Sequence, residues 1–177
     1  MSALQWILLG IGGLVVLAGV GMGGGLVYLS RNQPPDAGVA HGVQDGRLAA
    51  CPATPNCVST QAPENDRRHY AEPIRYAGTV DEARDRVEEW LAAQENVRRV
   101  RDDRNYLRVV FRSRVFGFQD DFEVLLQQPG DAKEEGNGAV IVHVRSAARV
   151  GQGDMGVNRS RYESLRDALL GDQRSDS

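Results

Sequence analysis

Chemically useful side chains are most concentrated in residues 145–161, RSAARVGQGDMGVNRSR. The planar guanidinium groups in this segment can bind carboxylates and phosphates through paired hydrogen bonds. We therefore expect a site for an anion here, made of the arginines, two polar neighbours and two residues from elsewhere in the chain. The candidate ligand-binding residues are Asp120, Arg145, Arg149, Asp154, Asn158, Arg159, Arg161 and His69.

Three hypotheses account for these arginines. Arg159 and Arg161 fall in the first turn of a predicted helix, where cations oppose the helix dipole. The preferred hypothesis is a non-catalytic module that binds an anionic small molecule, lipid headgroup or partner through Arg145, Arg149, Arg159 and Arg161 near Asp120. The first alternative is a hydrolase-like enzyme that uses Asp120 and His69 as an acid–base pair. The second alternative is a structural envelope protein, in which Asp120 and Asp154 pair with the arginines internally.

The sequence lacks the motifs of several common binding and catalytic sites. There is no P-loop, no dinucleotide-binding fingerprint, no G-x-S-x-G and no H-E-x-x-H. We therefore expect no cofactor and no metal. A net charge of only -3 gives no global field that would recruit nucleic acid.

Cys51 and Cys57 are the only two cysteines, and they flank a proline-rich turn. A structural disulfide is the favoured interpretation, and it would imply an oxidising compartment. A redox pair fits less well because such pairs usually have the spacing C-x-x-C. A zinc site with His41 and His69 has suitable ligand types but lacks the usual cysteine spacing.

Periodicity predicts the elements that must position these groups. Residues 79–94 form a helix with a capping box of Thr79 and Glu82. Residues 139–145 are nearly all apolar and predict a central strand, in which His143 is a satisfied histidine. An edge strand is expected around Pro73, and a last helix capped by Asn158 runs to about residue 170.

Residues 106–116 alternate as a half-buried antiparallel strand. A two-residue turn at 117–118 would place Arg114 opposite Asp121 and Arg112 opposite Glu123. These pairs would be surface ion pairs of little energetic value. Asp120 would then lie on the apolar side, where its carboxylate either needs a partner or lies solvated at a frayed strand end. The fold class expected is α+β, an antiparallel meander packed by two helices and preceded by one transmembrane helix.

The first 30 residues contain no charged side chain. Residues 4–29 are apolar or glycine apart from Gln5, and this run exceeds the roughly 20 residues that cross a bilayer. A signal peptide has a shorter apolar core preceded by basic residues, so we expect an uncleaved anchor with the lipid bilayer as its partner. Glycines spaced by four residues also predict a weak homodimer through this span.

The predicted organisation is a transmembrane anchor at 1–30, a flexible linker at 31–47, an α+β domain at 48–171 and a disordered tail at 172–177. Arg31 weakly favours a cytoplasmic domain, whereas the cysteine pair favours the opposite side. We expect a single-pass membrane protein with its soluble domain in the periplasm or otherwise outside the cytoplasm.

Long motifs in the chain resemble a known family. CPATPNCVSTQA at 51–62, GFQDDFEV at 117–124 and VRSAARVGQGDMGVNRSRYESLR at 144–166 are similar to the family called domain of unknown function 1499. The resemblance covers about residues 48–170 and excludes the apolar segment. The family has no established activity, so the resemblance implies no reaction or substrate. It implies that the motif positions include Cys51, Asn56, Cys57, His69, Asp120, Arg145, Ser146, Arg149, Gly151, Asp154, Gly156, Asn158 and Arg159, with Thr60 and Ala148 where serine is more usual.

Overall fold

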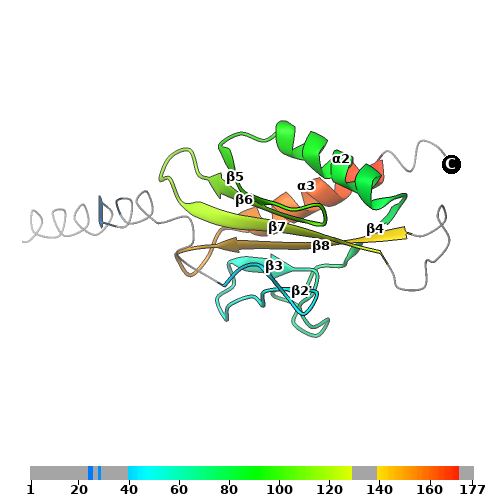
Figure 1. Ribbon diagram of the computed structural model, residues 1–177. Coiled ribbons are helices and arrows are strands. Elements are labelled where there is room, and N and C mark those ends of the chain that lie inside the picture. The colour runs from blue at the N-terminus through cyan, green and yellow to red at the C-terminus, as the bar shows by residue number, and fades with distance from the viewer. Residues whose placement is uncertain (1–23, 26–27, 29–39, 129–138, 172–177) are drawn as a thin grey trace, which may run out of the picture.

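The computed structural model describes residues 24–25, 28, 40–128 and 139–171 (Figure 1). Its strands are β1 (Val43–Gln44), β2 (Arg47–Leu48), β3 (Cys57–Ser59), β4 (Ile74–Ala77), β5 (Val97–Asp102), β6 (Tyr106–Arg112), β7 (Gln119–Gln127) and β8 (Ala139–Ala148). Its named helices are α2 (Val80–Ala92) and α3 (Val157–Gly171).

Six strands form one antiparallel sheet in the order β3-β8-β7-β6-β5, and β4 also pairs with β8. The strands β1 and β2 form a separate two-stranded sheet. Both helices lie against the same side of the large sheet, which confirms the α+β class with two helices (Figure 1). We call this side the apolar face, and we call the other side the charged face.

The helix α2 confirms the sequence prediction in detail. The Thr79 side chain accepts a hydrogen bond from the backbone of Glu82, whose carboxylate accepts one from the Thr79 backbone. This reciprocal capping satisfies two backbone donors that the helix itself leaves open. The helix buries Ala83, Val87, Trp90 and Leu91.

The helix α3 begins differently from the prediction, because Asn158 does not cap it. The carboxylate of Asp154 accepts hydrogen bonds from the backbone N–H groups of Gly156 and Asn158, at 3.1 and 2.8 Å. The Asn158 side chain instead points inward and is buried. An aspartate carboxylate before the first turn also suits the helix dipole.

Three aromatic rings lie at the centre of the apolar face. Trp90 lies 5.2 Å from Phe122 and 6.1 Å from Phe111, measured between ring centroids. Leu165 and Leu169 of α3 are fully buried in the same cluster. Because burial of one such side chain is worth about 1.5–3 kcal/mol, this cluster holds the helices on the sheet.

The turn between β6 and β7 is wider than predicted. Arg112 pairs with Gln119 rather than with Glu123, so the register differs from the prediction by four residues. Ser113 closes the loop with backbone hydrogen bonds to Phe118 and Gly117, and Arg114 forms an ion pair with Glu95. An even shift keeps each side chain on its predicted face, so only the cross-strand partners change.

Over β7 the charged face is covered rather than exposed to solvent. Leu48 packs with Tyr106 and Leu125 in a small second cluster. The predicted surface ion pairs of Asp121 and Glu123 are therefore wrong, because both side chains are 0% exposed. Residues 42–47, assigned to the linker from the sequence, contribute β1, the turn after it and the first residue of β2 to this cover.

Within the part of the chain that the structure describes, no helix is both long and apolar enough to span a membrane. The predicted anchor at residues 4–29 lies outside the described residues, apart from Gly24, Gly25 and Tyr28. Residues 31–39 of the predicted linker and the tail at 172–177 also lie outside them.

Candidate functional site

The charged face is built around Asp121 on β7. Its carboxylate accepts a hydrogen bond from Nε of Arg108 at 3.0 Å. Arg149 donates to both carboxylate oxygens, each at 2.8 Å. Asp121 pairs with residue 110 on one side and residue 147 on the other, so both arginines are its diagonal neighbours across the sheet. One buried carboxylate therefore joins β6, β7 and the end of β8.

Glu123 is the second buried carboxylate of this face. It lies directly opposite Arg145, whose guanidinium donates to it at 2.8 Å. The Tyr106 hydroxyl and the Gly42 backbone N–H each donate to its other oxygen at 2.7 Å. Burial, and then the negative charge of Glu123, raises the pKa of Tyr106. These contacts fasten the N-terminal segment to the sheet.

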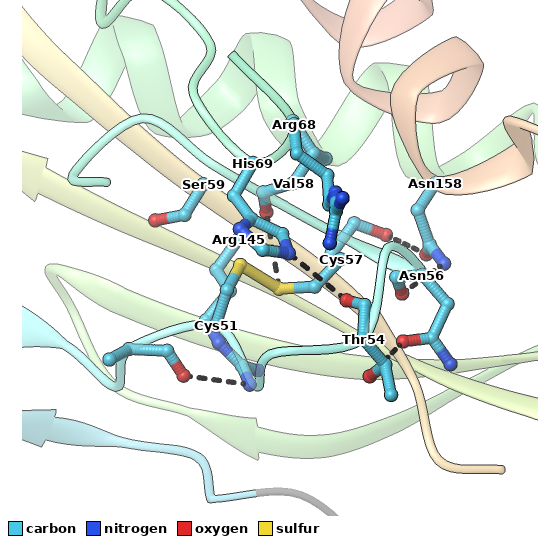
Figure 2. The surroundings of a disulfide bond; sticks show 12 residues. Cys51, Thr54, Asn56, Cys57, Val58, Ser59, Arg68, His69, Arg145 and Asn158 are labelled. Atoms are coloured by element: carbon cyan, nitrogen blue, oxygen red, sulfur yellow. Dashed lines mark hydrogen bonds between the residues drawn. A yellow bond between two sulfur atoms is a disulfide. The ribbon is translucent and has the colours of Figure 1, made fainter. Parts of the chain in front are cut away.

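The two cysteines form a disulfide, which confirms the favoured interpretation (Figure 2). Their sulfur atoms are bonded to each other, so the alternative of thiolate ligands in a zinc site with His41 and His69 is wrong. The residue before this bond also contacts Arg145, whose guanidinium donates to the Ala50 carbonyl at 3.5 Å.

His69 is buried beside this disulfide loop (Figure 2). Its Nδ1 lies 2.7 Å from the Asp66 carboxylate, and its Nε2 lies 3.0 Å from the Thr54 carbonyl oxygen. Both partners carry acceptor oxygens, so the imidazole is held between two acceptors. The hydrogen bond from His69 is the main reason why the pKa of Asp66 is lowered.

On the apolar face, Asp120 pairs with Arg161 at 3.3 Å. The Arg161 guanidinium stacks 4.0 Å from the centroid of Phe111 and donates to the Asn158 side chain at 3.1 Å. Burial raises the pKa of Asp120 in spite of the neighbouring cation, and burial likewise lowers the pKa of Arg161. The Asn158 oxygen also accepts a hydrogen bond from the Ser146 hydroxyl.

The structure separates the eight candidate residues rather than bringing them to one pocket. Arg145 and Arg149 lie on the charged face, whereas Asp120, Asn158 and Arg161 lie on the apolar face. Arg159 donates to the carbonyl oxygens of Tyr70 and Arg68, at 2.9 and 3.3 Å. Asp154 caps α3. The His69 ring contacts the Asp66 carboxylate and the Thr54 carbonyl rather than Asp120. The arginines of residues 145–161 thus already have partners within the protein.

A cavity that the sequence analysis missed lies beside the charged face. It has a volume of about 420 Å³, and we call it the basic cleft. It is lined by His41, Gly42, Arg98, Arg99, Val100, Arg101, Tyr106 and Arg108. No acidic side chain is among these lining residues, although Arg99, Arg101 and Arg108 pair with carboxylates outside them.

A β-bulge in β5 creates this arrangement. Arg98 and Arg101 are three residues apart, so a regular strand would direct them to opposite faces. The register shifts between Arg99 and Arg101, which leaves Arg98 opposite Val110 and Arg101 opposite Arg108. Both arginines therefore share the charged face with Arg108. The sequence VRRVRD carries no signal for the bulge, which explains why the cleft escaped prediction.

A second cavity of about 440 Å³ lies around His143, between the loop after β3 and the strands β4 and β8. His143 Nδ1 lies 3.3 Å from the Thr60 hydroxyl. Burial, and then the charge of Arg47, lowers the pKa of His143. The lining combines Arg47 and Arg75 with Glu64 and Glu72, so its charge does not select a ligand of one sign.

Comparison with known proteins adds one finding. No curated protein matches this chain. The model of one family, described as "Protein of unknown function (DUF1499)", matches residues 47–169 and so covers β2 to α3, the disulfide and both buried carboxylates. The chain belongs to the DUF1499 family.

Proposed function

We propose that this protein is a non-catalytic binding module, tethered to a membrane outside the cytoplasm, that holds an anionic ligand in the basic cleft. The ligand class is a compound that bears a phosphate or carboxylate group. The observation that carries the proposal is the lining of the cleft, which contains four arginines and a histidine and no acidic residue, although Arg99, Arg101 and Arg108 also pair with carboxylates outside the lining.

Electrostatics favours an anion at this position. Arg101 forms an ion pair with Asp103 at 2.6 Å, and its guanidinium lies 6.0 Å from the centroid of Tyr106. Arg108 is fixed by its contact with Asp121, and Arg98 is exposed at the rim. Guanidinium groups that are already held in place bind an oxyanion with less loss of side-chain freedom.

The location of the ligand differs from the one expected from the sequence. Arg145 and Arg149 are buried against Glu123 and Asp121. Their pairing supports the alternative of an internally paired structural network for these groups. The structural network and the binding site are therefore assigned to different arginines.

Two features support the tethered, extracytoplasmic location. The apolar run at residues 4–29 is long enough to cross a bilayer. The Cys51–Cys57 disulfide is typical of an oxidising compartment.

Isothermal titration of the full chain in nanodiscs tests the proposal, with inorganic phosphate and citrate as soluble probes. We expect saturable binding that weakens as salt concentration rises. Replacing both Arg98 and Arg101 with glutamine should weaken it about tenfold or more, because hydrogen bonds between charged groups are lost. Repeating the titration in nanodiscs with and without phosphatidylglycerol distinguishes a lipid headgroup, which would compete with the soluble anion.

The matched control is Arg104→Gln. Arg104 is exposed, pairs with Asp81 and does not line the cleft. The single R98Q and R101Q variants each remove the same charge as this control. If the control weakens binding as much as either of them, only the net charge matters and the proposed site is wrong. Unchanged affinity in the double variant would lead to the same conclusion.

A further inference from the structure

Exposed apolar side chains gather in two loops of the protein. Six large apolar residues are exposed in the described part of the chain. Four of them lie in these two loops, counting Val157 at the start of α3. Val115 and Phe116 lie between β6 and β7 and are 72% and 52% exposed. Met155 and Val157 follow β8 and are 104% and 46% exposed. We call residues 113–118 and 150–157 the apolar loops.

Both apolar loops lie at the same end of the sheet. Arg112 pairs with Gln119, so the first loop closes at this end. Asp120 pairs with Ala148, and the Arg149 backbone N–H donates to the Gln119 carbonyl, so the second loop leaves the sheet there as well. In Figure 1 this is the end toward which the arrow of β8 points.

The exposure of Met155 is imposed by the fold. Its φ angle is 55°, in the left-handed region that a long side chain rarely adopts. The loop is held by Asp154, which caps α3, and by Asn56, whose side-chain amide donates to the Gly151 carbonyl at 2.8 Å. A strained residue that is held in this way points to a role for its exposed side chain.

We propose that the apolar loops dock on the bilayer in which residues 4–29 are anchored. This inference rests on the membrane tether of the proposed function but not on the basic cleft. Residues 31–40 would extend at most about 35 Å, so the domain stays near the surface. A tethered domain meets that surface at a high effective concentration, so a few apolar side chains suffice to dock it. Arg112 precedes the first loop, and Arg114, which also pairs with Glu95, lies within it; both match the negative charge of lipid phosphates.

Depth measurements with spin labels test this proposal on the full chain in vesicles. A nitroxide on an unnatural keto amino acid is placed at position 115 or 155, which leaves the native disulfide undisturbed. The vesicles contain phosphatidylcholine alone or with phosphatidylglycerol. We expect both labels to become accessible to oxygen and protected from a water-soluble nickel reagent, more strongly with the anionic lipid. In the protein labelled at 155, Val115→Asp should return the label toward water.

Two further positions make the outcome decisive. Position 104 lies in the turn between β5 and β6 at the opposite end of the sheet, and its side chain is 77% exposed. A label there should stay in water. A label at position 15 reports on the anchor itself. Water-like labels at 115 and 155 together with a buried label at 15 would overturn loop docking alone, whereas a water-exposed label at 15 would overturn the tether.

Discussion

Along β7 both faces of the sheet are buried, but they are held together by different forces. The strand β7 supplies both of them, since Phe122 and Val124 point toward the helices while Asp121 and Glu123 point toward the N-terminal segment. All four side chains are buried. The apolar face is stabilised by removal of hydrocarbon from water, which depends little on the exact partner.

The charged face depends on exact partners. Its buried guanidinium and carboxylate groups have lost their hydration, and their mutual attraction only roughly offsets that loss. Arg145 also has a buried Nε atom with no hydrogen-bond partner among the described residues. From this difference we infer that the charged face sets strand register and fixes the N-terminal cover rather than adding much net stability.

The largest expected effect comes from breaking one buried pair. Glu123→Ala leaves Arg145 without its carboxylate and removes the acceptor of Tyr106 and Gly42. We expect the free energy of unfolding to fall by about 3–5 kcal/mol. Urea-induced unfolding of the full chain in a mild detergent measures this change.

The control replaces the whole pair by Glu123→Leu together with Arg145→Met. If the charged face mainly gives specificity, this double variant recovers most of the lost stability, because no buried charge remains unpaired. On the apolar face, Leu165→Ala should cost about 2–5 kcal/mol through the cavity it leaves. A double variant as unstable as Glu123→Ala would contradict the proposed difference between the faces.

The sequence predicts the apolar face well and the charged face poorly. The capping box and apolar stripe of α2 arise from contacts within the helix, so they can be read locally. Asp120 on the apolar side also follows from strand alternation, which survives a register error of four residues. The burial of Asp121 and Glu123 depends on a distant covering segment, and alternating charges along a strand are equally typical of a solvated face.

The candidate site shows the same limit. The concentration of arginines at 145–161 is visible in the sequence, but their separation depends on where β8 ends. A strand that ends at Arg145 leaves the later arginines free to converge. The observed strand runs to Ala148 and places Arg145 and Arg149 on the charged face. The basic cleft depends on a bulge, for which the sequence has no marker.

A smaller effect is expected from the covalent link that holds the cover of the charged face. Closure of the short loop between Cys51 and Cys57 is worth about 2 kcal/mol by the chain-entropy estimate. Reductant should lower the urea midpoint of the wild type and leave a C51S/C57S variant unchanged. Equal midpoints for the oxidised and reduced wild type would mean that the disulfide does not stabilise the cover.

The smallest effect compares two carboxylates in different surroundings. Burial raises the pKa of Asp120 above its ordinary value of 3.8, so the folded protein binds this proton more tightly than the unfolded chain does. The contribution of Asp120 to stability must therefore fall as pH rises from about 4 through the folded pKa. Asp66 has a lowered pKa because of His69, so its contribution is present above its ordinary value and is lost as pH falls through the folded pKa. The free energy of unfolding is measured for the wild type, Asp120→Asn and Asp66→Asn on both sides of pH about 4. The wild-type value minus the Asp120→Asn value should fall as pH rises, whereas the wild-type value minus the Asp66→Asn value should rise. Slopes of the same sign would mean that burial does not outweigh Arg161 at Asp120, and that this ion pair behaves like an ordinary solvated pair.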